Sequence, residues 1–136
     1  VDELLITRNT TESLGTVIHG LDWAPGDEAV MADLDYSSML QQFRQERARH
    51  GITCVELTLP LHPASDAAIV DLYAAAITPR TKAVLITHLN NITGQILPVR
   101  KIADMARERG VFVIVDSAHA FAHLDYQVPD LGGDFL

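Results

Sequence analysis

The sequence contains a single cysteine and no long hydrophobic run, and both scarcities limit what the chain can be. One cysteine, Cys54, excludes an internal disulfide, and its apolar neighbours Ile52 and Val55 predict a buried strand residue in a reducing compartment. No apolar stretch is long enough to span a membrane, and no charged leader with an apolar stretch marks a signal peptide. The sequence therefore predicts a cytoplasmic location.

Positive charge is also scarce. Lys and Arg number 10 against 18 Asp and Glu, which gives a formal net charge of -8. This balance argues against a surface for nucleic acid or anionic lipid, and Arg44, Arg47 and Arg49 are interpreted as the solvated face of a helix. With 48% hydrophobic residues, the chain is expected to form a single domain, residues 1–136, with a real core.

Strand-like and helix-like segments alternate along the chain, which predicts an α/β fold of three layers, α/β/α, with a mainly parallel sheet. The expected strands are short apolar runs at residues 4–7, 28–32, 52–57, 82–87 and 111–115. The expected helices, in which apolar residues recur at helical spacing, cover residues 11–21, 37–50 and 65–77 and a segment that begins at Pro98.

Polar residues follow the expected strands, at the points where the carboxyl ends of parallel strands share one edge of the sheet. Asp116 closes the apolar run 111–115, so its carboxylate could hold a cationic or basic group, although an acid there could equally cap the next helix. Thr10 and Thr11 lie at an expected helix start, where free backbone N–H groups attract phosphate, but threonines at such places are also simple caps.

Tyr36, Asn90 and Asn91 follow two further strands. Tyr36 could be a packing aromatic or a platform for a planar ligand. The two asparagines, followed by Thr93 and Gly94, could form an ordinary turn. No local feature decides between these readings.

Two alternatives to a small-molecule enzyme site remain open. Asp116, His119 and His123 have a spacing that would place three metal ligands on one face of a helix. A non-catalytic α/β module that binds a nucleotide or another protein is the second alternative. The lack of a glycine-rich phosphate loop gives dinucleotide or triphosphate binding little support.

Three boxes of residues, taken together, resemble those of the class V aminotransferases, pyridoxal-phosphate (PLP) enzymes that include cysteine desulfurases and isopenicillin-N-epimerase-like proteins. The boxes are Thr10-Thr11-Glu12-Ser13, Thr87-His88-Leu89-Asn90-Asn91-Ile92-Thr93-Gly94 and Val115-Asp116-Ser117-Ala118-His119-Ala120. The resemblance covers nearly the whole chain and implies part of the large domain of the fold-type I PLP-dependent transferase fold. His119, and Asp35-Tyr36 where many desulfurases carry a histidine, make the chain look closer to the epimerase-like branch.

The resemblance implies roles for the residues that would hold the cofactor ring. Asp116 would pair with the pyridine nitrogen and keep it protonated, so that the ring can act as an electron sink for a substrate carbanion. Ala118 would lie against one face of the ring and Tyr36 would stack on the other. Asp116 and His119 are the implied catalytic residues.

The resemblance also implies contacts to the cofactor's oxygen atoms. Thr10 and Thr11 would hold the phosphate. Asn91 and His119 would contact the phenolic oxygen, with His88 as structural support beside them.

One element of the family's chemistry is missing, namely the lysine that forms the internal Schiff base. The only lysines are Lys82, just before an expected strand at the end away from the site, and Lys101, in the first turns of a helix. Because the chain begins with Val1 and stops at Leu136 as an apolar segment starts, we expect an incomplete large domain without the small domain.

The resemblance implies an enzyme that acts on an amino acid or related amine, by transamination or by epimerase, lyase or desulfurase chemistry. Enzymes of this family are usually homodimers, so a homodimer is expected here. The 136 residues alone are expected to be inactive because they lack a suitable lysine.

Overall fold

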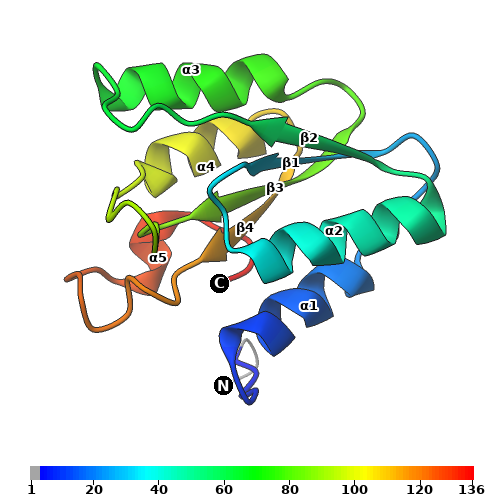
Figure 1. Ribbon diagram of the computed structural model, residues 1–136, viewed down its shortest axis with the longest axis horizontal. Helices are drawn as coiled ribbons and strands as arrows, with labels where there is room; N and C mark the ends of the chain where they lie inside the picture. The colour runs from blue at the N-terminus through cyan, green and yellow to red at the C-terminus, as the bar shows by residue number, and fades with distance from the viewer. Residues whose placement is uncertain (1–3) are drawn as a thin grey trace.

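A four-stranded parallel sheet is the middle layer of the structure, a computed structural model in which residues 4–136 are described (Figure 1). Its strands are β1 (Glu28–Ala32), β2 (Thr53–Leu57), β3 (Thr81–Thr87) and β4 (Phe112–Asp116), in the order β2-β1-β3-β4. One face carries α1 (Thr10–Gly20) and α2 (Ser37–His50). The other face carries α3 (Asp66–Ala76), α4 (Val99–Arg107) and the short α5 (Val128–Leu131). The predicted three-layer fold is confirmed.

The chain reverses its direction across the sheet after β2. It runs outward from β1 to β2 through α2, then returns past β1 to β3 through α3 and continues to β4 through α4. Because crossovers between parallel strands are right-handed, opposite directions place the connecting helices on opposite faces. Ligands in such sheets bind at the carboxyl ends of the strands, where the direction changes, which here is between β1 and β3.

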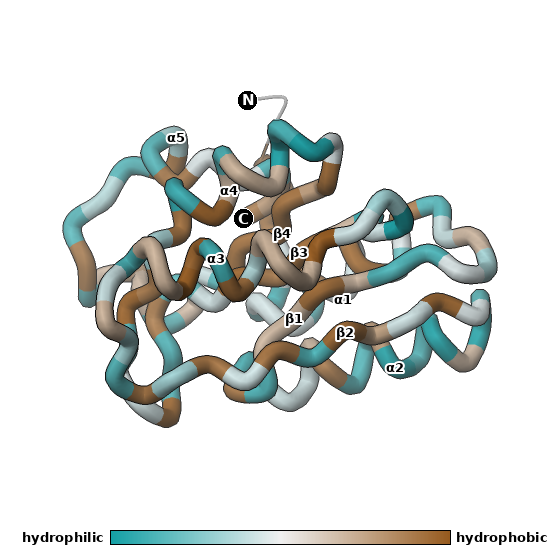
Figure 2. Tube along the Cα trace, turned by 90° about the horizontal axis from the view of Figure 1, so that it is seen from above, coloured by the Kyte–Doolittle hydropathy of each residue, from teal (hydrophilic) through white to brown (hydrophobic). Residues whose placement is uncertain are grey.

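Side chains of the inner strands alternate between two apolar clusters. Val30 and Val84 pack beneath α3 and α4, whereas Met31 and Leu85 pack beneath α1 and α2. Because both faces of the sheet are covered, the inner strands are apolar along most of their length, as the brown segments at the centre of Figure 2 show.

The helices begin and end where local side chains provide hydrogen bonds. Asn9 caps α1, since its side chain accepts a hydrogen bond from the backbone N–H of Glu12 at 3.0 Å. Ser65 caps α3 in the same way, through the backbone N–H of Ala68 at 3.2 Å. Gly51 follows α2 with a φ of 73°, a left-handed conformation that glycine adopts without steric strain.

The strand predicted at residues 4–7 is wrong. Leu4, Leu5 and Ile6 are 70%, 71% and 88% exposed and lie in no strand. A short apolar run becomes a strand only where a neighbouring strand supplies backbone partners, and within residues 4–136 no strand pairs with this segment. Local composition could not reveal that missing partner.

The predicted burial of Cys54 is also only partly correct. Cys54 is half-buried because β2 is an edge strand, with one side of its ladder open. Two residues of β2, Thr53 and Glu56, are exposed, in contrast to the fully buried β1. The position of a strand within the sheet is set by topology and not by its own residues.

Candidate functional site

A cavity of about 300 Å³ lies at the carboxyl edge of the sheet, at the reversal between β1 and β3. It is lined by Asn9, Thr10, Thr11, Tyr36, Met39, Asn91, Asp116, Ala118 and His119. All seven residues that the sequence analysis assigns to cofactor binding are among them. They come from four separate segments of the chain, which the parallel topology brings to one edge.

One end of the cavity is formed by the start of α1. Thr10 and Thr11 are the first two residues of this helix, and Asn9, not either threonine, is its cap. Within residues 4–136, neither threonine hydroxyl donates to a protein acceptor, so both are available to a ligand. The free N–H groups and the positive end of the helix dipole make this corner suited to an anion.

The start of α2 contributes a second wall. Tyr36 immediately precedes α2, lines the cavity and is 43% exposed, so it is not packed into the core. Met39, three residues on, lies on the same face of the helix and also lines the cavity. Met39 is not among the residues predicted from the sequence, although its i+3 spacing from Tyr36 could have indicated it.

Asp116 lies at the end of β4 and is only 6% exposed. Its Oδ1 accepts a hydrogen bond from the backbone N–H of Ala118 at 3.0 Å, and turns rather than an α-helix follow directly, so Asp116 closes a turn and does not cap a helix. Burial raises the pKa of this carboxyl, while the Ala118 N–H and the nearby His119 act in the opposite direction. Such an acid favours a cationic partner that would compensate its buried charge.

The two asparagines after β3 differ in position: Asn90 makes structural hydrogen bonds and Asn91 lines the cavity. Asn90 is buried and organises the turn, since its Oδ1 accepts hydrogen bonds from the backbone N–H groups of Ile92 at 2.9 Å and Thr93 at 3.0 Å. Asn91 is exposed and lines the cavity. The turn reading is therefore correct for Asn90, whereas Asn91 is free to contact a ligand.

His88 lies behind the cavity and does not line it. Its ring packs edge-on against Tyr126, with centroids 4.9 Å apart, and its Nδ1 lies 3.4 Å from the hydroxyl of Ser117. Burial lowers the pKa of His88, which favours a neutral ring. His88 therefore packs behind the cavity, and its predicted role as support beside the cofactor stays a prediction.

Neither lysine reaches the cavity. Lys82 is the second residue of β3, at the opposite end of the strand, where its Nζ lies 3.0 Å from Asp27 Oδ2 and also bonds the carbonyl of Asp22. Lys101 lies in α4, on the other face of the sheet from α1, and its Nζ bonds Asp66 Oδ2 at 2.8 Å. The cavity therefore has acidic, hydroxyl and amide groups but no amine nucleophile among residues 4–136.

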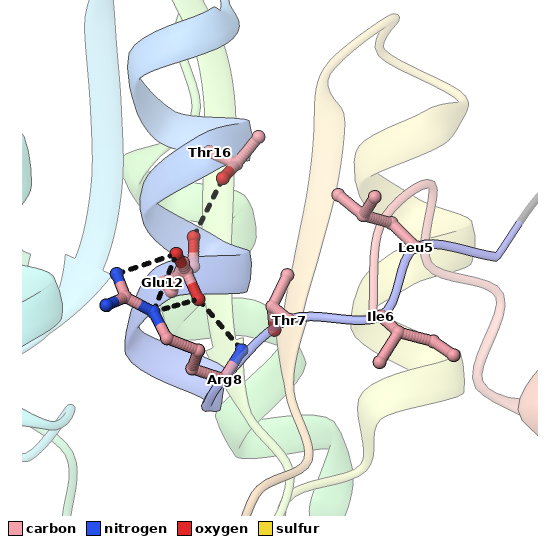
Figure 3. Close-up of a pocket in the computed structure, with 6 residues that line it drawn as sticks. All are labelled: Leu5, Ile6, Thr7, Arg8, Glu12 and Thr16. Atoms are coloured by element: carbon pink, nitrogen blue, oxygen red, sulfur yellow. Dashed lines mark hydrogen bonds and ion pairs between the residues drawn. The ribbon is translucent and has the colours of Figure 1, made fainter.

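A second hollow, beside the start of α1, has no comparable set of free groups. It is lined by Leu5, Ile6, Thr7, Arg8, Glu12 and Thr16 (Figure 3). Its charged groups satisfy each other, since Arg8 Nε donates to Glu12 Oε2 at 3.1 Å and the Arg8 backbone N–H donates to the same oxygen at 2.8 Å. The candidate site is therefore the cavity at the sheet edge.

The described part of the chain offers neither a metal cluster nor a membrane span. Among residues 4–136, no group of three or more His, Cys, Asp or Glu side chains is arranged to hold a metal ion. The metal alternative assumed a helix from Asp116 to His123, but Asp116 ends a strand and turns follow it. No helix in the same range is both long and apolar enough to cross a bilayer.

Comparison with known proteins identifies the family. The sequence matches the family described as aminotransferase class-V over residues 1–136. The chain belongs to this family. Similar class V relatives include a probable cysteine desulfurase of Pseudomonas aeruginosa, 35% identical over 98% of the chain, and the isopenicillin N epimerase of Streptomyces clavuligerus, 31% identical over 97% of it. The chain spans about a third of their length, 33% in each case.

Solved structures share the class V fold. A mutant of C-DES with glycine covalently linked to its PLP cofactor superimposes with a TM-score of 0.86 and 28% identity, over 93% of this chain and 34% of that one. The cysteine desulfurase CsdA of Escherichia coli gives 0.83 and 28%, over 95% and 33%. These likenesses confirm the predicted partial large domain of the fold-type I PLP-dependent transferase fold. The predicted cofactor, pyridoxal phosphate, is the one bound in the first structure.

Proposed function

We propose that this chain is the central part of the large domain of a PLP-dependent enzyme that acts on an amino acid or related amine. The proposal rests on one observation: the start of α1, which is suited to an anion, the exposed ring of Tyr36 and the buried acid Asp116 all line one cavity. The relatives named above are a probable cysteine desulfurase and an isopenicillin N epimerase, so desulfurase, lyase or epimerase chemistry is proposed alongside transamination.

The groups in the cavity fit the parts of pyridoxal phosphate. The start of α1, with Thr10 and Thr11, suits the phosphate. Tyr36 offers an exposed ring for stacking, and Ala118 is small enough to leave room at the other face. A cavity of about 300 Å³ is at the small end of the usual size for cofactor sites.

The residues of this chain would bind and orient the cofactor. Asp116 would hold a proton on the ring nitrogen by placing a buried negative charge beside it. Asn91 and His119 would bond the phenolic oxygen. When bound, the group would supply the electron sink that this type of chemistry needs.

The phosphate assignment is testable with two ligands that differ only in that group. In the full-length protein, Thr10→Val/Thr11→Val is expected to weaken PLP binding about tenfold, because two hydroxyl donors to an anion are lost. The affinity for pyridoxal, which lacks the phosphate, should stay within about twofold on the same grounds. Absorbance titration measures both dissociation constants.

Thr16→Val is the matched control for this pair. Thr16 lies in the same helix but is exposed, and its hydroxyl donates to the carbonyl of Glu12 at 2.9 Å. This variant should bind both ligands like the wild type. Equal losses for PLP and pyridoxal in the double variant would refute the phosphate role, and a wild-type protein that does not bind PLP would refute the proposed function.

We also propose that residues 1–136 by themselves do not turn over an amino acid. Both lysines are engaged in ion pairs outside the cavity, so neither lysine amine is available for a covalent link to the cofactor. Incubating the purified chain with PLP and cysteine or alanine should release no product above a protein-free blank. Product formation that saturates with substrate would contradict this.

A homodimer remains a prediction from the resemblance. A cytoplasmic location remains a prediction from the single cysteine in the sequence. Sedimentation of the full-length protein would report its oligomeric state.

A further inference from the structure

Asp35 is a buried acid that the proposed cofactor contacts do not use. It lies in the turn between β1 and Tyr36 and is 4% exposed. One carboxyl oxygen, Oδ2, accepts a hydrogen bond from the backbone N–H of Ala32 at 2.7 Å. The other, Oδ1, lies 2.6 Å from the hydroxyl of Thr87.

Thr87 connects this turn to the strand that carries Asp116. It is the last residue of β3 and is paired in register with Asp116, the last residue of β4. The backbone N–H of His88 donates to the carbonyl of Asp116 at 2.9 Å, which holds the two strand ends together. Tyr36 is therefore connected to Asp116 through two residues. Asp35 is its neighbour in the chain and is hydrogen-bonded to Thr87, and Thr87 is paired in register with Asp116.

A second contact supports the same turn from β3. Asn90 Nδ2 donates to the carbonyl of Leu34 at 2.6 Å. The turn that precedes Tyr36 is thus attached to the end of β3 at two consecutive residues, Leu34 and Asp35. The Tyr36 carbonyl accepts hydrogen bonds from the backbone N–H groups of Met39 at 2.8 Å and Leu40 at 3.3 Å, so Tyr36 is held by the start of α2 on one side and by the attached turn on the other.

The charges around Asp35 favour its neutral form. Burial raises the pKa of Asp35 to about 7, the hydrogen bonds from Thr87 and Ala32 oppose the rise, and the charges of Asp116 and Asp33 add to it. From α3, the titratable group that faces it is the phenol of Tyr73, whose pKa is raised by burial and by both Asp35 and Asp33.

We propose that Asp35 is a positioning residue that fixes Tyr36 relative to Asp116 through its hydrogen bond to Thr87. The residue would act through its shape and hydrogen bonds, while Asp116 remains the acid that faces the ring. The proposal rests on the proposed function, in which Tyr36 and Asp116 contact the same cofactor ring.

Three variants of the full-length protein test the proposal at pH 6.5, with the dissociation constant for PLP as the readout. Asp35→Ala removes both hydrogen bonds and is expected to weaken binding about tenfold. Thr87→Val removes only the hydroxyl at nearly constant shape and should weaken binding about threefold. Asp35→Asn keeps a donor and an acceptor in place and should bind within about twofold of the wild type.

A spectroscopic readout separates positioning from general loss of structure. The circular-dichroism band of bound PLP reports how the ring sits in its chiral surroundings, and it should change in Asp35→Ala and Thr87→Val but not in Asp35→Asn. Asp33→Ala is the matched control, because Asp33 lies in the same turn but is exposed and makes only a 3.4 Å contact to the N–H of Leu59. Its binding and spectrum should match the wild type.

The outcomes distinguish this inference from the proposed function. Failure of the wild type to bind PLP refutes the proposed function. Normal binding and an unchanged band in Asp35→Ala, with PLP bound by the wild type, refute the positioning role alone. If Asp35→Ala does not fold, folded Thr87→Val decides, and wild-type binding with an unchanged band in that variant overturns the proposal.

Discussion

Asp116→Asn in the full-length protein is expected to lower kcat on the order of 100-fold while the protein still folds and binds PLP. Amide and carboxyl have nearly the same shape, so the turn bond to the N–H of Ala118 can be retained. What is lost is the negative charge that would hold a proton on the ring nitrogen. Removing one preorganised electrostatic partner of a developing charge commonly lowers the rate by a factor of about 100 to 1,000.

The fold of this variant should not suffer, because burial already disfavours the charged form of Asp116. A neutral amide at that place removes an unfavourable buried charge. Steady-state kinetics with absorbance spectra of the bound cofactor would measure the effect, and the spectra should report a ring nitrogen that is no longer protonated.

Asp125→Asn is the appropriate comparison for Asp116→Asn. Asp125 is an exposed acid in the loop that follows and does not line the cavity, so its loss should leave kcat within about twofold. Turnover near the wild-type value in Asp116→Asn would remove the ring-nitrogen role from Asp116.

The second large effect is a pH-dependent gain in stability for Asp35→Asn in the cofactor-free, full-length protein. The variant and the wild type should be about equally stable near pH 4. At pH 8 the variant should be the more stable by on the order of 4 kcal/mol. Each pH unit between the unfolded and folded pKa values of Asp35 lowers the unfolding free energy of the wild type by about 1.4 kcal/mol.

The direction follows from the raised pKa of Asp35, about 7 in the folded protein against the ordinary value of 3.8. Between these values the folded protein keeps the proton and the unfolded chain releases it, so the wild type loses stability as pH rises. Below about pH 4, Asp35 is protonated in both the folded and the unfolded protein. Above about pH 7 it is ionised in both, and the difference in stability between variant and wild type becomes constant. Asparagine resembles the protonated acid at every pH and therefore does not show this loss.

Urea denaturation at pH 5, 6, 7 and 8 would measure the difference in unfolding free energy between the two proteins. Asp125→Asn serves as the control because its carboxyl is exposed and does not act on the pKa of Asp35, and its stability should follow that of the wild type across the range. A difference between wild type and Asp35→Asn that does not vary with pH would show that Asp35 is ionised throughout.

Much of the fold could be predicted because its signals are local. The apolar runs that became β1, β3 and β4 are buried along most of their length, and strands buried on both faces are largely apolar whatever their order in the sheet. The run at residues 4–7 has the same local character and yet forms no strand, since no strand in the described range pairs with it. Burial of Cys54 was overestimated for a related reason, because nothing in β2 itself specifies that it lies at the edge.

For the site, the sequence indicated most of the residues that line the cavity. Polar residues at strand ends and helix starts, such as Thr10, Asn91 and Asp116, are visible as breaks in an apolar pattern, and parallel topology implies that they share an edge. Residues that line or support the cavity without interrupting an apolar pattern leave no such signal in the sequence. Met39 reads as an ordinary helix residue, and Asp35 reads only as the neighbour of Tyr36.

Only the tertiary structure decided which of these residues make structural hydrogen bonds and which line the cavity. It assigned the helix cap to Asn9 and left the hydroxyls of Thr10 and Thr11 available, and it made Asn90 a turn residue and Asn91 a cavity residue. It also buried Asp35 beside Thr87. The physical reason is that hydrogen-bond partners and burial depend on segments distant in the sequence, whereas periodicity and residue type are properties of each segment alone.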